Sequence, residues 1–182
     1  ARRWVVEAAD RARRDQAAPT AVRLYTQALD LLGIAELRAD EDPVRAGEAV
    51  RLLLARSAAA TEGWELPLAR GDADLARKLA EHLGDRAAVA RAVVAKGSVQ
   101  QREGDLDGAV AALTDAAERF RELGDIAGVG EALRQRGMVE IFGGRVVEAE
   151  VSAEAALAAS TEAGDRRKIG RASCRERVCS VV

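Results

Sequence analysis

A short motif returns at a fixed spacing along this chain. Leu83-Gly84-Asp85 recurs as Leu123-Gly124-Asp125 and, with Ala in place of Leu, as Ala163-Gly164-Asp165, so that the copies lie 40 residues apart. A period of about 20–50 residues is typical of proteins that stack one small structural unit many times. The register also holds between the copies, where Gly97 matches Gly137, Gly104 matches Gly144, Ala109 matches Ala149 and Ala116 matches Ala156, and where the preceding unit has Ser57, Trp64, Ala69 and Ala76.

Within each unit the apolar residues recur three or four positions apart, as they do on one face of a helix. The pattern runs over 86–102 and again over 106–123, so each unit is predicted to be two helices. Gly104-Asp105 between them supplies a residue that tolerates a left-handed backbone, followed by a carboxylate that can cap the next helix. Asp85, Asp125 and Asp165 are expected to cap in the same way. Short loops make neighbouring helices antiparallel, and we expect helices near 2–15, 19–32, 44–61, 66–82, 86–102, 106–122, 126–142 and 146–162.

Composition agrees with an all-α fold and excludes several classes of protein. Only 3 of the 182 residues are Pro, and long blocks are rich in Ala, Leu, Arg and Glu, which favour helices. The 28 basic and 30 acidic side chains give a net charge of −2, which argues against nucleic-acid binding. No stretch approaches the roughly 20 apolar residues of a membrane-spanning helix. We therefore expect a cytoplasmic protein that binds neither nucleic acid nor membrane.

The small residues resemble the pattern of the tetratricopeptide repeat family, which has small residues at positions eight, twenty and twenty-seven and Gly at position fifteen. Gly97, Gly104, Ala109 and Ala116 occupy these positions in one unit. The N-terminal stretch is similar, and the resemblance covers nearly all of 1–168. It implies an α-solenoid of about four antiparallel helix pairs, near 2–32, 44–82, 86–122 and 126–162. The unit of 40 residues is longer than the family's unit of about 34, and the 33–43 connection contains Asp40-Glu41-Asp42 before Pro43 at a helix start.

The two ends of the chain require separate treatment. The chain opens with Ala rather than Met, and a predicted helix begins directly at residue 2, so we expect a fragment. Residues 169–178 resemble the translation of a sequencing adapter, so 169–182 is interpreted as a non-native tail. Both cysteines, Cys174 and Cys179, lie in that tail, and a metal site built on them is disfavoured because zinc requires about four ligands.

A search for catalytic and metal-binding motifs gives no candidate. The only histidine, His82, is predicted in the last turn of a helix, where a cation complements the helix dipole. The segment 105–108 lacks the ligand spacing of a calcium loop and is interpreted as a helix cap. Gly124, Gly128 and Gly130 do not match a dinucleotide-binding fingerprint. We therefore predict no enzyme activity, no metal and no cofactor.

The resemblance implies where a partner would bind. In stacked helix pairs the first helices line a concave wall, which commonly holds an extended peptide or a partner helix. Met138, Ile141 and Phe142 would add an apolar patch to this wall. By the family pattern, the polar side chains on the wall are Arg51, Arg91, Gln101, Arg102, Glu131 and Arg134.

Two segments suggest a wider context. Residues 120–125 and 21–32 resemble the C-terminal repeat regions of large bacterial signalling proteins, in which an ATP-binding domain precedes the solenoid. The resemblance implies a sensor or regulatory arm that binds another protein, or another domain of its own parent chain. Two alternatives stay open: a purely structural spacer, and a helical domain that binds a small molecule or is an enzyme. If the chain is a spacer, replacing Arg91 and Arg134 by Glu should leave every partner interaction of the full-length protein intact. If it is a binder, the same replacement should disturb such an interaction.

Overall fold

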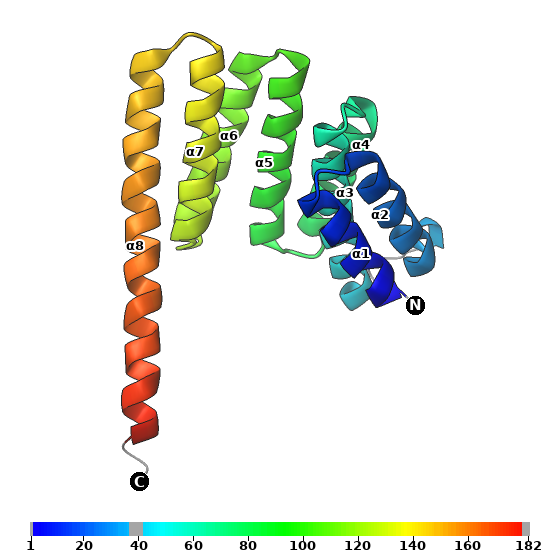
Figure 1. Cartoon of the computed structure of the whole chain (residues 1–182), viewed down its shortest axis with the longest axis horizontal. Coiled ribbons are helices and arrows are strands. Elements are labelled where there is room, and N and C mark those ends of the chain that lie inside the picture. Colours follow the sequence, from blue (N-terminus) through cyan, green and yellow to red (C-terminus); the bar gives the residue numbers. More distant parts are fainter. Residues whose placement is uncertain (1, 37–41, 180–182) are drawn as a thin grey trace.

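The computed structural model describes residues 2–36 and 42–179, and the side chains of this part up to Gly164 with the exception of Glu36. These residues form eight α-helices and one short 3-10 helix, η1, and the described chain contains no β-strand (Figure 1). The all-α class and the approximate positions of the helices are confirmed. The elements are α1 (Arg2–Arg14), α2 (Ala18–Leu32), η1 (Ile34–Glu36), α3 (Pro43–Glu62), α4 (Leu66–His82), α5 (Arg86–Glu103), α6 (Leu106–Glu122), α7 (Ile126–Phe142) and α8 (Val146–Cys179).

The last helix differs from the prediction. It was expected to end near residue 162 before a cap at Asp165, whereas α8 continues without a break through Gly164 to Cys179. The third copy of the repeated motif therefore does not form a turn. The first two copies each lie between two packed helices, while the third has no later helix beside it within the described chain. The side chains of Asp165, Cys174 and Cys179 lie outside the described part, as do residues 180–182, Asp40 and Glu41.

The turn between the two helices of each unit has the same backbone conformation in all four units. The fifteenth position is left-handed at Gln16, Trp64, Gly104 and Gly144, with φ of 59°, 63°, 85° and 72°. Only the last two are glycines, which adopt this conformation without steric cost. The register in the first unit is offset because the connection after α2 is longer, so that Gln16 corresponds to Trp64. The backbone thus repeats even where the sequence does not.

Aspartates cap the helices that follow the tight turns. The Asp85 carboxylate accepts from the backbone N–H of Ala88 at 2.9 Å, and Asp125 does the same for Gly128 at 2.9 Å. Asp105 accepts from the backbone N–H of Gly108 at 3.0 Å, which confirms that 105–108 is a cap. These bonds satisfy amides that have no partner within the helix. Asp42 caps α3 in the same way, ahead of Pro43.

The small residues of the repeat lie where helices approach closely. A methyl group on Gly97 would stand 3.0 Å from Cγ of Leu113, and one on Gly137 would stand 3.3 Å from Cβ of Ser152. Ala109 and its counterparts are buried in the same contacts. Because protein interiors are close-packed, larger side chains at these positions would push the helices apart.

Each helix packs mainly against the helices directly before and after it in the sequence. Figure 1 shows the consequence, with α8 at one end of the molecule and α1 and α2 at the other. Buried residues accordingly form separate clusters along the molecule, one mostly from α1–α5 and another from α5–α8. The first helices of the units, α1, α3, α5 and α7, supply most of the residues that line one groove.

Candidate binding groove

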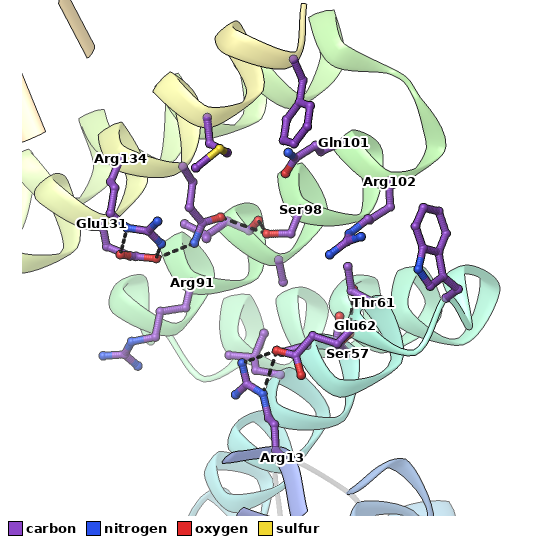
Figure 2. Close-up of a pocket in the computed structure, with 18 of the residues that line it drawn as sticks. Arg13, Ser57, Thr61, Glu62, Arg91, Ser98, Gln101, Arg102, Glu131 and Arg134 are labelled. Atoms are coloured by element: carbon purple, nitrogen blue, oxygen red, sulfur yellow. Dashed lines mark hydrogen bonds and ion pairs between the residues drawn. The ribbon is translucent and has the colours of Figure 1, made fainter. Parts of the chain in front are cut away.

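A groove of about 1030 Å³ runs along α3, α5 and α7, and the end of α1 closes one side (Figure 2). Its polar side chains project from successive turns of these helices, because residues three or four positions apart share a helix face. Apolar side chains from the same helices, among them Leu54 and Val94, lie between them. The groove is therefore mixed in character, with charged groups along an apolar floor.

The structure brings seven of the eight sequence-predicted binding residues together in this groove. Arg51 is the exception: it is exposed on α3, and the groove begins about one turn further along that helix, at Leu54. Ile141, which was expected in the apolar patch, is exposed but does not line the groove either. The predicted residues that line the groove are Arg91, Gln101, Arg102, Glu131, Arg134, Met138 and Phe142.

The groove carries more positive than negative charge. Four arginines and two glutamates line it, which gives a net charge of +2 in a chain whose net charge is −2. Two of the arginines are paired: Arg13 Nη2 lies 3.1 Å from Oε1 of Glu62, and Arg134 Nη2 lies 2.7 Å from Oε1 of Glu131. Arg91 and Arg102 form no ion pair with any described residue.

A hydrogen-bonded network fixes the side chains on the α7 wall. The Arg134 guanidinium donates to both oxygens of Glu131, and the Gln135 amide donates to Oε1 of the same carboxylate at 2.7 Å. The Ser98 hydroxyl donates to Oε1 of Gln135 at 3.0 Å, which links α5 to α7. The bond from Arg134, with help from Gln135, lowers the pKa of Glu131, and it raises the pKa of Arg134. Both groups are therefore charged at neutral pH.

Trp64 stands at the rim of the groove and was missed as a site residue. Its side chain is 63% exposed, and the Arg102 guanidinium lies 5.0 Å from the centre of its ring. Such a cation–π contact holds Arg102 without neutralising its charge. In the sequence Trp64 appeared only as a break in the glycine pattern, yet its left-handed φ of 63° is that of the glycines it replaces.

The other missed residues could have been found from the repeat. Arg13 is the first-unit counterpart of Gln101, Glu62 corresponds to Arg102, and Ser98 corresponds to Met138. Each therefore faces the groove because a predicted residue in another unit does. The sequence therefore contains the information that places these residues, because the 40-residue register assigns them to the same positions as the predicted residues.

Several polar side chains of the groove are engaged in hydrogen bonds or ion pairs within the protein. The hydroxyl of Ser57 donates to the carbonyl of Ala69, and that of Thr61 donates to the carbonyl of Ser57. Glu62 and Glu131 are held by arginines. Nowhere in the described chain do three or more histidine, cysteine or carboxylate side chains come together to hold a metal ion.

Comparison with known proteins adds no relative: no protein-family model and no curated protein sequence matches this chain. None of the helices in the described residues has an apolar stretch long enough to cross a bilayer.

Proposed function

We propose that this chain is a non-catalytic helical-repeat scaffold, an α-solenoid of about four antiparallel helix pairs similar to tetratricopeptide repeats. Three repeated features support the architecture: the left-handed turn within each pair, the aspartate caps and the small residues between helices. Packing of each helix on its sequence neighbours is what a stack of pairs requires.

In this proposal the groove binds an extended acidic segment of another protein or of another domain of the parent chain. The observation that carries the proposal is that Arg91 and Arg102 project into the groove without an ion pair among the described residues. Arginine binds carboxylates through two parallel hydrogen bonds. The apolar floor adds contacts for aliphatic or aromatic side chains between the acidic ones.

The resemblance of residues 120–125 and 21–32 to bacterial signalling proteins gives this scaffold a context. The scaffold would be the sensor or regulatory arm, and a bound segment would report on the state of a partner. A purely structural spacer is the competing function, and it requires no ligand in the groove.

Binding of synthetic peptides tests the proposal. The probe is a fluorescent peptide that alternates glutamate with leucine and phenylalanine, compared with the same peptide carrying lysine in place of glutamate. We expect the acidic peptide alone to bind, and we expect the double variant Arg91→Glu/Arg102→Glu to weaken its binding at least about tenfold. Arg51→Glu is the matched control, because Arg51 is an exposed arginine outside the groove.

Two results would contradict the proposal. Equal binding of the acidic and basic peptides would show that the groove arginines do not select the ligand. A spacer would bind neither peptide. In addition, the full-length parent protein would keep its wild-type interactions when it carries either Arg91→Glu/Arg102→Glu or Arg91→Glu/Arg134→Glu.

A further inference from the structure

The two groove arginines that form no ion pair with described residues stand apart from each other. Arg91 and Arg102 lie eleven positions apart on α5. Eleven residues make about three turns of an α-helix, so the two side chains leave nearly the same face, at levels about 16 Å apart along the helix axis. Figure 2 shows Ser98 between them. The groove therefore presents two separate positive charges rather than one cluster.

Each of these arginines has an ion pair beside it, and the charges of that pair cancel. Beside Arg91, the Glu131 carboxylate is bound by Arg134 (Figure 2). At the level of the other free arginine, Glu62 occupies the same repeat position one unit earlier and is bound by Arg13. The acidic side chains of the groove thus do not compensate the free arginines, and each end keeps one positive charge for a ligand.

The floor between the two ends is mainly apolar. Leu54 and Ala58 of α3 and Val94 of α5 line the groove there. The Ser98 hydroxyl in this middle part already donates to Gln135. A ligand that spans the groove would therefore place apolar or small side chains between the groups that meet the two arginines.

Aromatic side chains distinguish one end of the groove from the other. Trp64 contacts the Arg102 guanidinium, and Phe142 occupies the same repeat position as Arg102 on the next first helix, α7. Both aromatic side chains are largely exposed and line the groove. The α7 counterpart of Arg91 is instead the charged Glu131. An aromatic side chain of a ligand would find apolar contacts of its own kind at the Arg102 end.

We propose that the groove recognises two carboxylates about five residues apart in an extended segment, with an aromatic side chain next to one of them. An extended chain rises about 3.3 Å per residue, so five residues match the roughly 16 Å between the levels of Arg91 and Arg102. The carboxylate beside the aromatic residue binds Arg102, and the other binds Arg91. This inference rests on the proposed function, because it specifies the acidic segment that the groove binds.

Peptides of equal length and composition test the spacing. Each contains two glutamates, with phenylalanine next to the second one and serine and leucine elsewhere, and the glutamates are separated by two, five or nine positions. We expect the five-position peptide to bind at least about fivefold more tightly than the other two, because its carboxylates reach both arginines without looping of the chain. Fluorescence anisotropy of labelled peptides measures the three dissociation constants.

Double-mutant cycles test which carboxylate meets which arginine. Arg91→Gln should weaken binding of the five-position peptide, but should have little effect once glutamine replaces the glutamate that is remote from phenylalanine. Arg102→Gln should couple in the same way to the glutamate beside phenylalanine. Arg51→Gln is the matched control, because Arg51 is exposed on α3 outside the groove. Coupling of Arg91 to the glutamate beside phenylalanine would overturn the assignment of the two ends.

Phe142→Ser tests the aromatic end. It should weaken binding of the five-position peptide at least about threefold, and it should not weaken binding of the same peptide with serine in place of phenylalanine. Ile141→Ser is the control, because Ile141 is exposed on the same helix but does not line the groove. Circular dichroism melts establish that the variants fold. Equal weakening of both peptides by Phe142→Ser would overturn the aromatic part of the inference.

The spacing series also separates failure of this inference from failure of the proposed function. Glutamate peptides that bind more tightly than their lysine equivalents, but equally at all three spacings, would overturn the inference and leave the proposed function in place. Absence of binding by every glutamate peptide would overturn both.

Discussion

One residue in each helix pair adopts a left-handed backbone whatever its side chain, and this position links stability to function. For a non-glycine residue the left-handed backbone conformation costs about 1–2 kcal/mol relative to the right-handed one. Gln16 and Trp64 both occupy it, at equivalent turns of the first and second pairs. Only Trp64 faces the groove, where its ring contacts Arg102.

Glycine substitutions at these two turns should therefore differ. Gln16→Gly should raise the free energy of unfolding by about 0.5–1 kcal/mol, because the backbone gain exceeds the added entropy of the unfolded chain. Trp64→Gly should gain the same backbone free energy but lose a cation–π contact worth about 0.5–1 kcal/mol. The free energy of unfolding of this variant should therefore change little, while its binding of the acidic peptide weakens. Urea unfolding measures the change in stability, and titration with the acidic peptide measures the change in binding. Unchanged peptide binding by Trp64→Gly would remove this residue from the site.

The only tyrosine predicts how stability depends on alkaline pH. The Tyr25 hydroxyl is buried and donates to Oδ1 of Asp10 at 2.6 Å, and burial together with this carboxylate raises the pKa of Tyr25 far above its ordinary value. The folded protein keeps this proton at a pH where the unfolded chain, with a pKa of about 10, releases it. The stability from Tyr25 is thus present below pH ~10 and is lost above it, by up to about 1.4 kcal/mol per pH unit.

The free energy of unfolding, measured in urea from about pH 9 to about pH 11.5, checks this dependence. The control is Tyr25→Phe, which removes the titrating phenol and should flatten the decline in stability, although it also lowers the stability at neutral pH. An equally steep decline in both proteins would show that other groups cause it.

At the scale of the helical element, close approach depends on small side chains. Ala109 is fully buried on α6, and its carbonyl lies 3.4 Å from where a methyl group on Gly97 of α5 would stand. Ala109→Leu should overfill this contact and lower the free energy of unfolding by about 1–3 kcal/mol. Ala111→Leu is the matched control, since Ala111 is exposed on the same helix. Equal thermal melts for the two variants would contradict the proposed packing.

Two arginines at equivalent positions, two units apart, each link neighbouring helices and form an ion pair with a buried carboxylate, which lies on the next helix for Arg56 and on the same helix for Arg136. Arg56 of α3 donates to both oxygens of Asp72 at 2.7 Å and to the Thr26 hydroxyl at 3.0 Å. Arg136 of α7 contacts Glu140, Ser152 and Thr114 in a similar way. The intervening counterpart, Lys96, is exposed. These guanidinium groups tie a first helix to the second helices on both sides of it.

At the scale of the whole molecule, the tail is predicted to contribute nothing to the fold. Helix α8 runs antiparallel to α7, continues to Cys179 and extends past the N-terminal end of α7 (Figure 1). Deletion of 169–182 should therefore leave the midpoint of thermal unfolding unchanged, because the helix pairs up to residue 164 keep their contacts. A fall of several degrees would show that this segment packs against the rest of the chain.

Much of the fold could be predicted because its contacts are local in sequence. The 40-residue repeat, the helical period and Gly104-Asp105 were enough to place seven helices to within one residue at each end. The end of α8 could not be placed, because the third motif copy differs from its predecessors only by Ala163 in place of Leu, but has no later helix beside it within the described chain. Among the predicted site residues, Arg51 does not line the groove, and Trp64, which lines it, was not predicted.

The sequence by itself determined the helices and their repeating unit, since hydrophobic period, turn residues and caps act within a few residues of one another. The tertiary structure decided which exposed side chains share a surface. Arg91 and Arg102 lie in one groove and form no ion pair with described residues, and Trp64 reaches the same groove from a turn. These properties depend on contacts between helices that are distant in sequence, which is why the local pattern does not contain them.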